Sequence, residues 1–289
     1  MPELPEVQTT VNGLNATVRG RKIVSVWTDY ENKISSSQFT IFNKGTIKNA
    51  QFFKQFKKKV VGEKILKAER RAKNILIHLS HGQTILVHMK MTGHFVYDKP
   101  EYPFIRFSLK LDNGKTLDLS DMRRFAKVTL IETDKIDESK HLSDIGPEPL
   151  EPSFTLKAFS FQLLRKPRGK IKTVLMNPSI IAGIGNIYSD EILWRASVHP
   201  NSLVAKIPKK NIEKMFKAMK MLLKKGIDFG GDSMSDYRNI QGERGQFQNH
   251  HEAYRRTGEK CRKDKGIIKR IVVGGRSAHF CSVHQAIYK

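Results

Sequence analysis

Residues 146–152 read GPEPLEP, and this proline-rich stretch divides the chain into two parts with different patterns. Proline lacks a backbone N–H and fixes φ, so three prolines in seven residues can continue neither a helix nor a strand. Before this stretch most segments alternate apolar and polar residues, whereas after it apolar residues recur at helical spacing. We therefore interpret 146–152 as a linker between a β-rich domain and a helical domain.

Two pairs of segments before the linker have the pattern of β-hairpins. Residues 74–79 (NILIHL) and 84–89 (TILVHM) are separated by a short polar break, and residues 107–111 and 116–119 flank the turn DNGK. Asn-Gly is a strong short-range signal for a tight hairpin turn. One helix is expected from about Pro5 to Val18.

Three segments after the linker have helix or loop character. Residues 171–196 predict two helices broken at 180–186, and residues 230–260 lack periodicity, which predicts a long loop. Residues 208–225 predict one helix that Gly226 is expected to end. Its apolar positions form a core-facing stripe, comprising Ile212, Met215, Phe216, Met219, Leu222 and Leu223.

Residues 261–284 (CRKDKGIIKRIVVGGRSAHFCSVH) have the spacing of a zinc ribbon. A Cys-x-x-Asp and a Cys-x-x-His knuckle flank a hairpin-like stretch with Gly-Gly near its middle. His is an ordinary zinc ligand and Asp an acceptable one, so four side chains offer a tetrahedral site: Cys261, Asp264, Cys281 and His284. Further candidates for the weakest position are His250, His251 and His279. The alternative is a metal-free hairpin held by its own core of Ile268, Val272 and Phe280.

The composition favours a polyanionic partner. Lys plus Arg total 52 against 28 Asp plus Glu, which gives a formal net charge of +24 and a pI near 10.0. Lysine-rich solvated faces are the ordinary alternative, but so large an excess is typical of nucleic-acid binding. No apolar run reaches the ~18 residues of a membrane span, and the N-terminus lacks a signal-peptide pattern. We expect a cytoplasmic, non-secreted protein that does not enter membranes.

The N-terminal sequence MPELPEV admits two interpretations. Proline and acidic residues are common in the first turn of a helix. Alternatively, removal of Met1 would make Pro2 a terminal secondary amine. An α-amino group has a pKa of about 7.7–8.0, well below that of Lys, so part of it is a neutral nucleophile that can form an iminium with a carbonyl-like carbon. Glu3 and Glu6 flank this amine and could transfer protons.

Seven motifs follow one another along essentially the whole chain: PELPEV at 2–7, RRAK at 70–73, HMKMTG at 88–93, DMRRF at 121–125, IGPEPL at 145–150, AGIGNIYSDEIL at 182–193 and GGRSAHFC at 274–281. Together they resemble the formamidopyrimidine-DNA glycosylase (Fpg/Nei) family of base-excision enzymes. Leu4 favours the Fpg branch, because Nei-type relatives tend to have Gly there.

The resemblance implies an α+β multidomain fold. An N-terminal catalytic β-sandwich with flanking helices would occupy residues 1–148. A helix-two-turn-helix DNA-binding domain with a lesion-capping loop would occupy 149–245, and a zinc-ribbon-like β-hairpin 246–289. DNA would lie across the cleft between these parts.

The resemblance also implies a bifunctional enzyme that removes oxidised purines such as 8-oxoguanine and formamidopyrimidines. Pro2 would attack C1′ of the damaged nucleotide and form a Schiff base, and Glu3 would act as acid and base in opening the sugar. Elimination of the flanking phosphates (β, then δ) would follow as AP lyase activity. Lys73 would reach the phosphate and base next to the lesion.

Further roles carried over from the family concern DNA contacts. The phosphate- or base-contacting set would be His88, Arg123, Asn186 and Arg276. Met91, Arg123 and Phe125 would fill the space left by a flipped base, although core packing is the alternative for Met91 and Phe125. The loop 236–248 would order over the flipped purine through Asp236, Tyr237, Gly242, Gly245, Gln246 and Phe247.

The expected partner is double-stranded DNA with oxidised bases or abasic sites, bound by a monomer in the nucleoid. The family module carries four cysteines, so one structural zinc ion is expected at Cys261, Asp264, Cys281 and His284, or none if Asp264 does not bind. Two other functions remain open. One is a Nei-like glycosylase for oxidised pyrimidines, and the other is a damaged-DNA-binding protein without catalysis.

Overall fold

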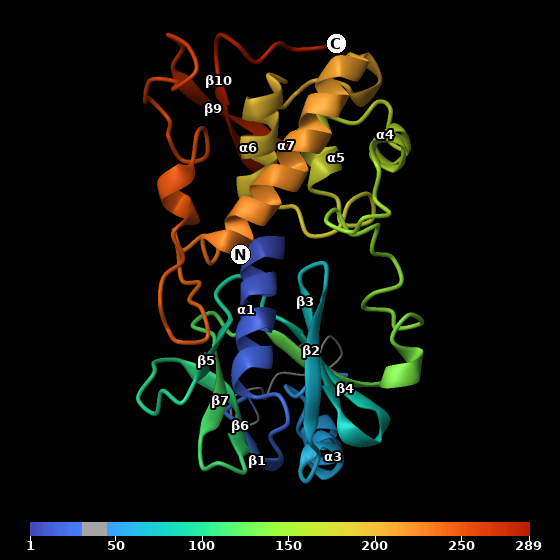
Figure 1. The fold of residues 1–289 in the computed structure, drawn as a ribbon, viewed down its shortest axis with the longest axis vertical. Helices are drawn as coiled ribbons and strands as arrows, with labels where there is room; N and C mark the ends of the chain where they lie inside the picture. The colour runs from blue at the N-terminus through green and yellow to red at the C-terminus, as the bar shows by residue number, and fades with distance from the viewer. Residues whose placement is uncertain (31–44) are drawn as a thin grey trace. The chain divides into compact units, whose positions relative to one another are not determined.

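A computed structural model describes residues 1–30 and 45–289 of the chain. These residues form two compact units (Figure 1). The N-terminal unit combines Met1–Ser143 with Gly230–Gln246, and the C-terminal unit combines Asp144–Phe229 with Phe247–Lys289. The loop segment 230–246 therefore packs with the β-rich part of the chain. The finer division into domains 1–148, 149–245 and 246–289 stays a prediction.

Two antiparallel four-stranded sheets build the N-terminal unit, which confirms the predicted β-sandwich. One sheet has the strand order β1 (Ile23–Thr28), β6 (Ile105–Leu111), β7 (Thr116–Ser120), β5 (His94–Tyr97). The other has the order β2 (Ile65–Arg71), β3 (Asn74–Leu79), β4 (Gln83–His88), β8 (Lys127–Glu132). Helices α1 (Leu4–Thr17) and α3 (Ala50–Val60) flank them, with single 3-10 turns at Ser80–Gly82 and Thr133–Lys135.

Both predicted hairpins are present. In the first, β3 pairs with β4 so that Ile77 faces Ile85, and both residues are fully buried. In the second, β6 pairs with β7 around a turn in which Gly114 has a φ of +79°. An L-residue rarely adopts this left-handed conformation, so glycine is needed there. Apolar side chains of both sheets and of α1 and α3 share one buried core.

The C-terminal unit contains four α-helices and a β-hairpin among its residues. The helices are α4 (Leu156–Leu164), α5 (Ile171–Leu175), α6 (Asn186–Ala196) and α7 (Lys209–Asp228), with 3-10 turns at Val204–Lys206 and Phe247–His250. The break between α5 and α6 confirms the predicted interruption. Across residues 1–30 and 45–289, no helix has the length and apolar character needed to cross a membrane.

The predicted end of α7 is wrong. The helix continues through Gly226 to Asp228, and Gly226 is buried. A glycine inside a helix costs only about 1 kcal/mol relative to alanine, so packing of the buried face is enough to carry the helix past it. The predicted apolar stripe of this helix is buried as expected, except that Phe216 is half-buried.

Strands β9 (Ile268–Val273) and β10 (Arg276–Cys281) pair antiparallel and confirm the predicted C-terminal hairpin. Gly274 and Gly275 form its two-residue turn with positive φ angles, as a tight hairpin turn requires. The expected core position of Val272 is wrong, because its side chain is 66% exposed. Successive strand residues point to opposite faces, and Val273 is buried instead.

Candidate functional site

Pro2, Glu3 and Glu6 lie together at the N-terminus of α1, and all three are buried. The Glu6 carboxylate accepts a hydrogen bond of 2.6 Å from the backbone N–H of Glu3. In return, the Glu3 carboxylate accepts from the backbone N–H of Glu6, which completes a capping box. These reciprocal bonds satisfy backbone donors of the first turn and hold both carboxyl groups next to Pro2.

The environment of Glu6 favours its protonated form. Burial raises the pKa of Glu6 to about 7, and the nearby charge of Glu3 acts in the same direction. Hydrogen bonds from the backbone N–H groups of Asp232 and Glu3 oppose this shift. Near neutral pH, Glu6 can therefore both release and accept a proton, as acid–base chemistry requires.

The segment 230–246 is anchored against α1, a feature that its sequence does not predict. The Tyr237 hydroxyl donates to the backbone oxygen of Glu6 (3.0 Å), and Tyr237 is only 3% exposed. Gly231 has a φ of +87°, and a Cβ there would lie 2.9 Å from the Glu6 side chain. On α1, Gly13 lies so close to the Ile240 side chain of this segment that a Cβ at residue 13 would clash with it. Residue 231 must therefore be glycine for the segment to approach Glu6.

The predicted lesion-loop residues occupy different environments. Gly245 donates its N–H to the Ser233 hydroxyl (2.9 Å), and Gly242 closes a turn with a φ of +83°. Asp236 is half-buried and Gln246 is exposed. Phe247 belongs to the C-terminal unit, where it is fully buried and stacks on Tyr188 at 4.9 Å between ring centroids.

Lys73 and His88 come together near the ends of β3 and β4. Burial lowers the pKa of His88 to about 3, and the charges of Lys90 and Lys73 act in the same direction. His88 is therefore neutral at physiological pH. Its Nδ1 accepts a hydrogen bond from the Lys90 N–H (3.0 Å), so the ring proton is assigned to Nε2. His88 can offer a phosphate a neutral N–H donor.

The predicted wedge of Met91, Arg123 and Phe125 is displayed at the surface of the N-terminal unit. Met91 is 38% and Phe125 48% exposed, so the alternative of core packing is wrong for both. The Arg123 guanidinium lies over the Phe125 ring, 4.6 Å from its centroid. Two large apolar side chains and a cation are thus available for insertion into a base stack.

Buried polar groups hold the loop that carries Arg123 and Phe125. Asp121 is fully buried, and its carboxylate accepts hydrogen bonds from the Thr92 hydroxyl and from the Ala126 N–H. The Thr92 hydroxyl oxygen accepts in turn from the Arg123 N–H (3.1 Å). The two hydrogen bonds of Thr92 join positions 29 and 31 residues apart, so no local pattern predicts them.

Asn186 and the C-terminal hairpin lie together in the C-terminal unit. Asn186 begins α6, and its Nδ2 donates to the hydroxyl of Ser277 (3.3 Å) in β10. Its Oδ1 is buried without a hydrogen-bond partner in the part of the chain that the structure describes. Arg276, which precedes Ser277, is exposed. Two predicted DNA contacts are therefore adjacent.

A buried polar network ties this hairpin to the helices. Lys172 in α5 forms an ion pair of 2.6 Å with Asp190 in α6, and both side chains are fully buried. The other Asp190 oxygen accepts from the backbone N–H and from Nδ1 of His279 in β10, each at 2.9 Å. No local pattern predicts this network, because its partners are 18 and 89 residues apart, and His279 pairs with Asp190.

The neighbouring Glu191 anchors the chain that leads into the hairpin. Its carboxylate accepts the backbone N–H groups of Glu252, Ala253 and Tyr254, at 2.8 to 3.0 Å. Burial raises the pKa of Glu191 despite these bonds. The acidic pair in the SDEIL sequence thus serves to dock the C-terminal module on α6.

The predicted metal ligands do converge. The donor atoms of Cys261, Asp264, Cys281 and His284 all lie within 4.8 Å of one another. His284 Nε2 is 3.0 Å from the carbonyl oxygen of Trp194, which directs Nδ1 toward the cluster. The backbone N–H groups of Lys263 and Val283 donate to the two sulfurs at 3.4 Å. This donor set fits a tetrahedral zinc site.

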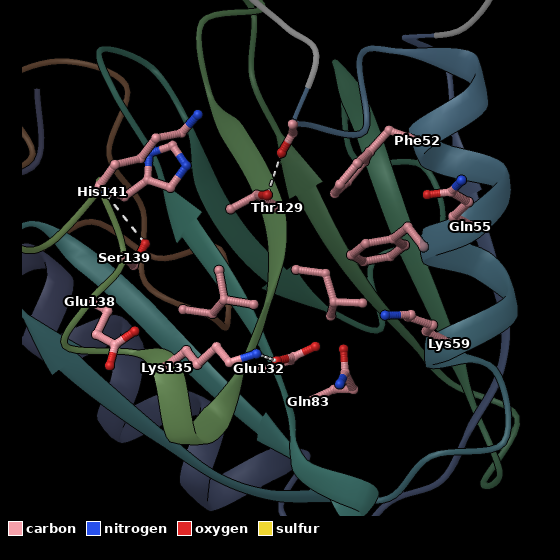
Figure 2. A pocket seen from close by; sticks show the side chains of 15 residues that line it. Phe52, Gln55, Lys59, Gln83, Thr129, Glu132, Lys135, Glu138, Ser139 and His141 are labelled. Carbon is pink, nitrogen blue, oxygen red and sulfur yellow. Dashed lines mark hydrogen bonds and ion pairs between the residues drawn. The ribbon is translucent and has the colours of Figure 1, made fainter.

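A separate pocket of about 470 Å³ lies between α3 and β8 in the N-terminal unit (Figure 2). Phe52, Leu130 and Ile131 contribute apolar side chains, while Lys59 and Glu138 are among its polar ones. The predicted site residues are not part of its lining, so the pocket is distinct from the site at α1.

Comparisons with known proteins identify the family. Residues 1–128 match the family model of the formamidopyrimidine-DNA glycosylase N-terminal domain, and residues 145–238 match the formamidopyrimidine-DNA glycosylase H2TH domain. A formamidopyrimidine-DNA glycosylase of Pelotomaculum thermopropionicum is 36% identical over 99% of this chain and 100% of its own. The corresponding protein of Bacillus subtilis is 34% identical, with 98% of each chain covered.

Solved structures agree with these matches. A Lactococcus lactis Fpg in complex with DNA containing an abasic site superimposes with a TM-score of 0.85 at 31% identity, covering 98% of this chain and 99% of that one. The wild-type L. lactis Fpg (MutM) bound to DNA containing N7-benzyl-Fapy-dG gives a TM-score of 0.84 at 32% identity, with the same coverage. This chain therefore belongs to the formamidopyrimidine-DNA glycosylase family, enzymes that act on damaged bases in DNA.

Proposed function

We propose that the protein is a bifunctional base-excision enzyme that removes oxidised purines and then cleaves the abasic strand by β,δ-elimination. The observation that carries the proposal is the pair of buried carboxyl groups, Glu3 and Glu6, beside Pro2 at the start of α1. A nucleophile flanked by proton-transfer groups is the arrangement that Schiff-base chemistry needs.

Removal of Met1 would free the secondary amine of Pro2 for this reaction. The amine attacks C1′ of the damaged nucleotide, the bond from C1′ to the base breaks, and an iminium forms between C1′ and Pro2. Glu3 gives a proton to the sugar as its ring opens, and Glu6, with a pKa near 7, can relay protons to and from Glu3. Loss of a C2′ proton then expels the 3′-phosphate, and a second elimination expels the 5′-phosphate.

Substrate choice is assigned to the segment 230–246, which hydrogen-bonds to the backbone and side chain of Glu6. Its buried side chains Tyr237 and Ile240 anchor it, and the residue that follows them, Gln241, is exposed. A segment held this firmly next to the reacting group can contact a flipped base. The relatives bound to DNA with Fapy-dG support a purine-derived lesion as the substrate.

DNA binding is assigned to groups in both units. The neutral Nε2–H of His88 and the ammonium of Lys73 would contact phosphates near the lesion, and Arg123 would bond the unpaired base opposite. In the C-terminal unit, Asn186 and the exposed Arg276 would hold the backbone. With a net charge of +24, binding should weaken steeply as salt rises, because bound counterions are released from the DNA.

One structural zinc ion is proposed at Cys261, Asp264, Cys281 and His284. A bound zinc ion would cross-link the two knuckles and keep the hairpin that carries Arg276 rigid. Metal analysis of the wild type beside Asp264→Cys and Asp264→Ala tests the assignment. Zinc near one per chain in the wild type, retained by Asp264→Cys and weakened in Asp264→Ala, is the expected result. No zinc in the wild type would indicate a hairpin held by packing alone.

A panel of duplexes tests the proposed substrate class. Each duplex carries one lesion: 8-oxoguanine, a formamidopyrimidine, an oxidised pyrimidine or an abasic site. We expect strand gaps at the purine lesions and at the abasic site. Faster excision of the oxidised pyrimidine would favour a Nei-like enzyme, and binding without cleavage of any duplex would favour a DNA-binding protein without catalysis.

A further inference from the structure

Residues 121–126, which carry Arg123 and Phe125, are called the wedge loop. A charged cluster that holds this loop takes no part in the proposed chemistry. The Asp29 carboxylate accepts two hydrogen bonds from the Arg124 guanidinium, at 2.7 and 3.2 Å. It also accepts one from Arg106 at 2.6 Å. We call these three residues the clamp. All of its side chains are at least two-thirds buried, with exposed fractions of 20% for Asp29, 29% for Arg124 and 15% for Arg106.

The clamp acts on the backbone of the wedge loop. Arg124 lies between Arg123 and Phe125 and has a φ of +57°, a left-handed conformation that L-residues rarely adopt. A non-glycine residue stays in that conformation only when its surroundings hold it there. The bidentate contact with Asp29 fixes the side chain of Arg124, and the Lys48 ammonium donates to its backbone oxygen.

Arg106 extends the clamp to the other side of the loop. Its Nε donates to the backbone oxygen of Asp121 (3.1 Å), whose side chain holds Thr92 and Ala126. The Asp29 carboxylate is therefore connected to the start of the segment through Arg106 and Asp121, and to its middle, between Arg123 and Phe125, through Arg124. Bidentate arginine–carboxylate pairs combine strength with a fixed geometry, which suits this positioning task.

We propose that Asp29 is a positioning residue, which holds Arg123 and Phe125 in the conformation that fills the space left by a flipped nucleotide. The inference rests on the proposed function, since a wedge matters only to an enzyme that extrudes bases. It makes a specific prediction about substrates. A single strand has no opposite base and no stack to fill, so its cleavage does not need the wedge.

The experiment compares Asp29→Asn with the wild type on two DNAs that carry the same abasic site, one double-stranded and one single-stranded. Asn keeps the size of the side chain but removes its charge. We expect the single-turnover rate on the duplex to fall by at least about tenfold, because small misplacements of binding groups are costly. The rate on the single strand should stay within about twofold.

Two further variants sharpen the comparison. Arg124→Lys keeps the charge but loses the two-pronged contact, so it should reproduce the effect of Asp29→Asn. Asp112→Asn serves as the control, because the Asp112 side chain is exposed and its ion pair with Arg21 is long (3.9 Å). Equal losses on duplex and single strand for Asp29→Asn, or no loss on either, would overturn the proposal.

A binding measurement keeps the inference separate from the proposed chemistry. A tetrahydrofuran abasic analogue cannot be cleaved, and its affinity can be measured in duplex and in single-stranded form. The wild type should prefer the duplex, and Asp29→Asn should lose at least about tenfold of that preference. If the wild type cleaves no DNA, the proposed function fails. An unchanged duplex preference in Asp29→Asn rejects the positioning role independently.

Discussion

The two units hold their polar site residues in different ways. In the N-terminal unit, Glu3 and Glu6 are fixed mainly by backbone groups at a helix end, which leaves their carboxyl groups able to exchange protons. In the C-terminal unit, Lys172 and Asp190 form an ion pair in the interior, and the proposed mechanism gives them no part in proton transfer. In the proposed mechanism, the buried carboxyl groups of the N-terminal unit therefore serve reactivity, whereas the buried ion pair of the C-terminal unit serves rigidity.

The difference has a physical basis. Burial that outweighs the accepted hydrogen bonds raises the pKa of a carboxyl group, as in Glu6, and makes it a candidate for acid–base chemistry. The same group beside a buried lysine is paired, and removing either partner leaves an isolated charge. Substitution of the carboxyl groups at α1 should therefore have a large effect on the reaction rate and a modest effect on folding. Substitution of the buried ion pair should have the reverse effects.

The largest expected effect is on the reaction. Glu3→Gln should lower the glycosylase rate by about 10²–10⁴-fold, because it removes a proton donor and acceptor while keeping the shape of the side chain. Affinity for an uncleavable lesion duplex should change little. Single-turnover assays and titrations measure the two quantities, and the exposed Glu101→Gln is the matched control. A parallel loss of affinity would show that Glu3 acts mainly in binding.

The next effect is on stability. Lys172→Met should lower the free energy of unfolding of the C-terminal unit by about 3–5 kcal/mol, because the buried Asp190 loses its lysine partner and keeps the hydrogen bonds from His279. Urea unfolding followed through the fluorescence of the buried Trp194 measures it. Lys217→Met, which breaks the exposed pair with Glu213, should cost at most about 0.5 kcal/mol. An equal loss of unfolding free energy in both variants would show that the buried ion pair contributes no more to stability than the exposed one.

A smaller effect depends on pH. The folded pKa of Glu6 is about 7, against an ordinary value of 4.5, so the folded state binds more protons between these values. Stability should therefore fall as pH rises from 4.5 to 7. Relative to Glu6→Gln, the wild type should lose about 2 kcal/mol of unfolding free energy between pH 5 and pH 8. A difference that is flat with pH would mean that Glu6 is not held in a protonated form.

The smallest effect concerns the grip on DNA. Arg276→Ala should weaken binding by about tenfold on lesion and undamaged duplexes alike, and should lower the salt slope by about one. Arg19→Ala removes the same charge from an exposed position in the N-terminal unit and serves as the control. A loss confined to lesion duplexes would instead assign Arg276 to lesion recognition.

Local patterns in the sequence predicted a large part of this molecule. The proline and acidic residues at the start of α1, the turn residues of the hairpins and the two knuckles act over a few residues each, and the structure confirms the elements they define. The four knuckle side chains also converge as their spacing predicts. The helix end predicted at Gly226 and the burial predicted for Val272 were wrong, because packing rather than local preference determines the structure at both positions.

The supporting interactions could not be predicted in this way. Asp29 and Arg124 are 95 residues apart, and Tyr237 and Glu6 are 231 apart, so their pairing depends on the completed fold. The family resemblance predicts residues that contact DNA, but it does not identify the residues that hold them in place. The structure adds these groups to the account.

The central claim is that Pro2 forms a covalent intermediate with the damaged nucleotide. Incubation with an abasic-site duplex in the presence of borohydride, followed by peptide mapping, tests it most directly. We expect one protein–DNA adduct, located on Pro2 of protein whose intact mass shows that Met1 has been removed. An adduct on a lysine, or no adduct although Met1 has been removed, would contradict it.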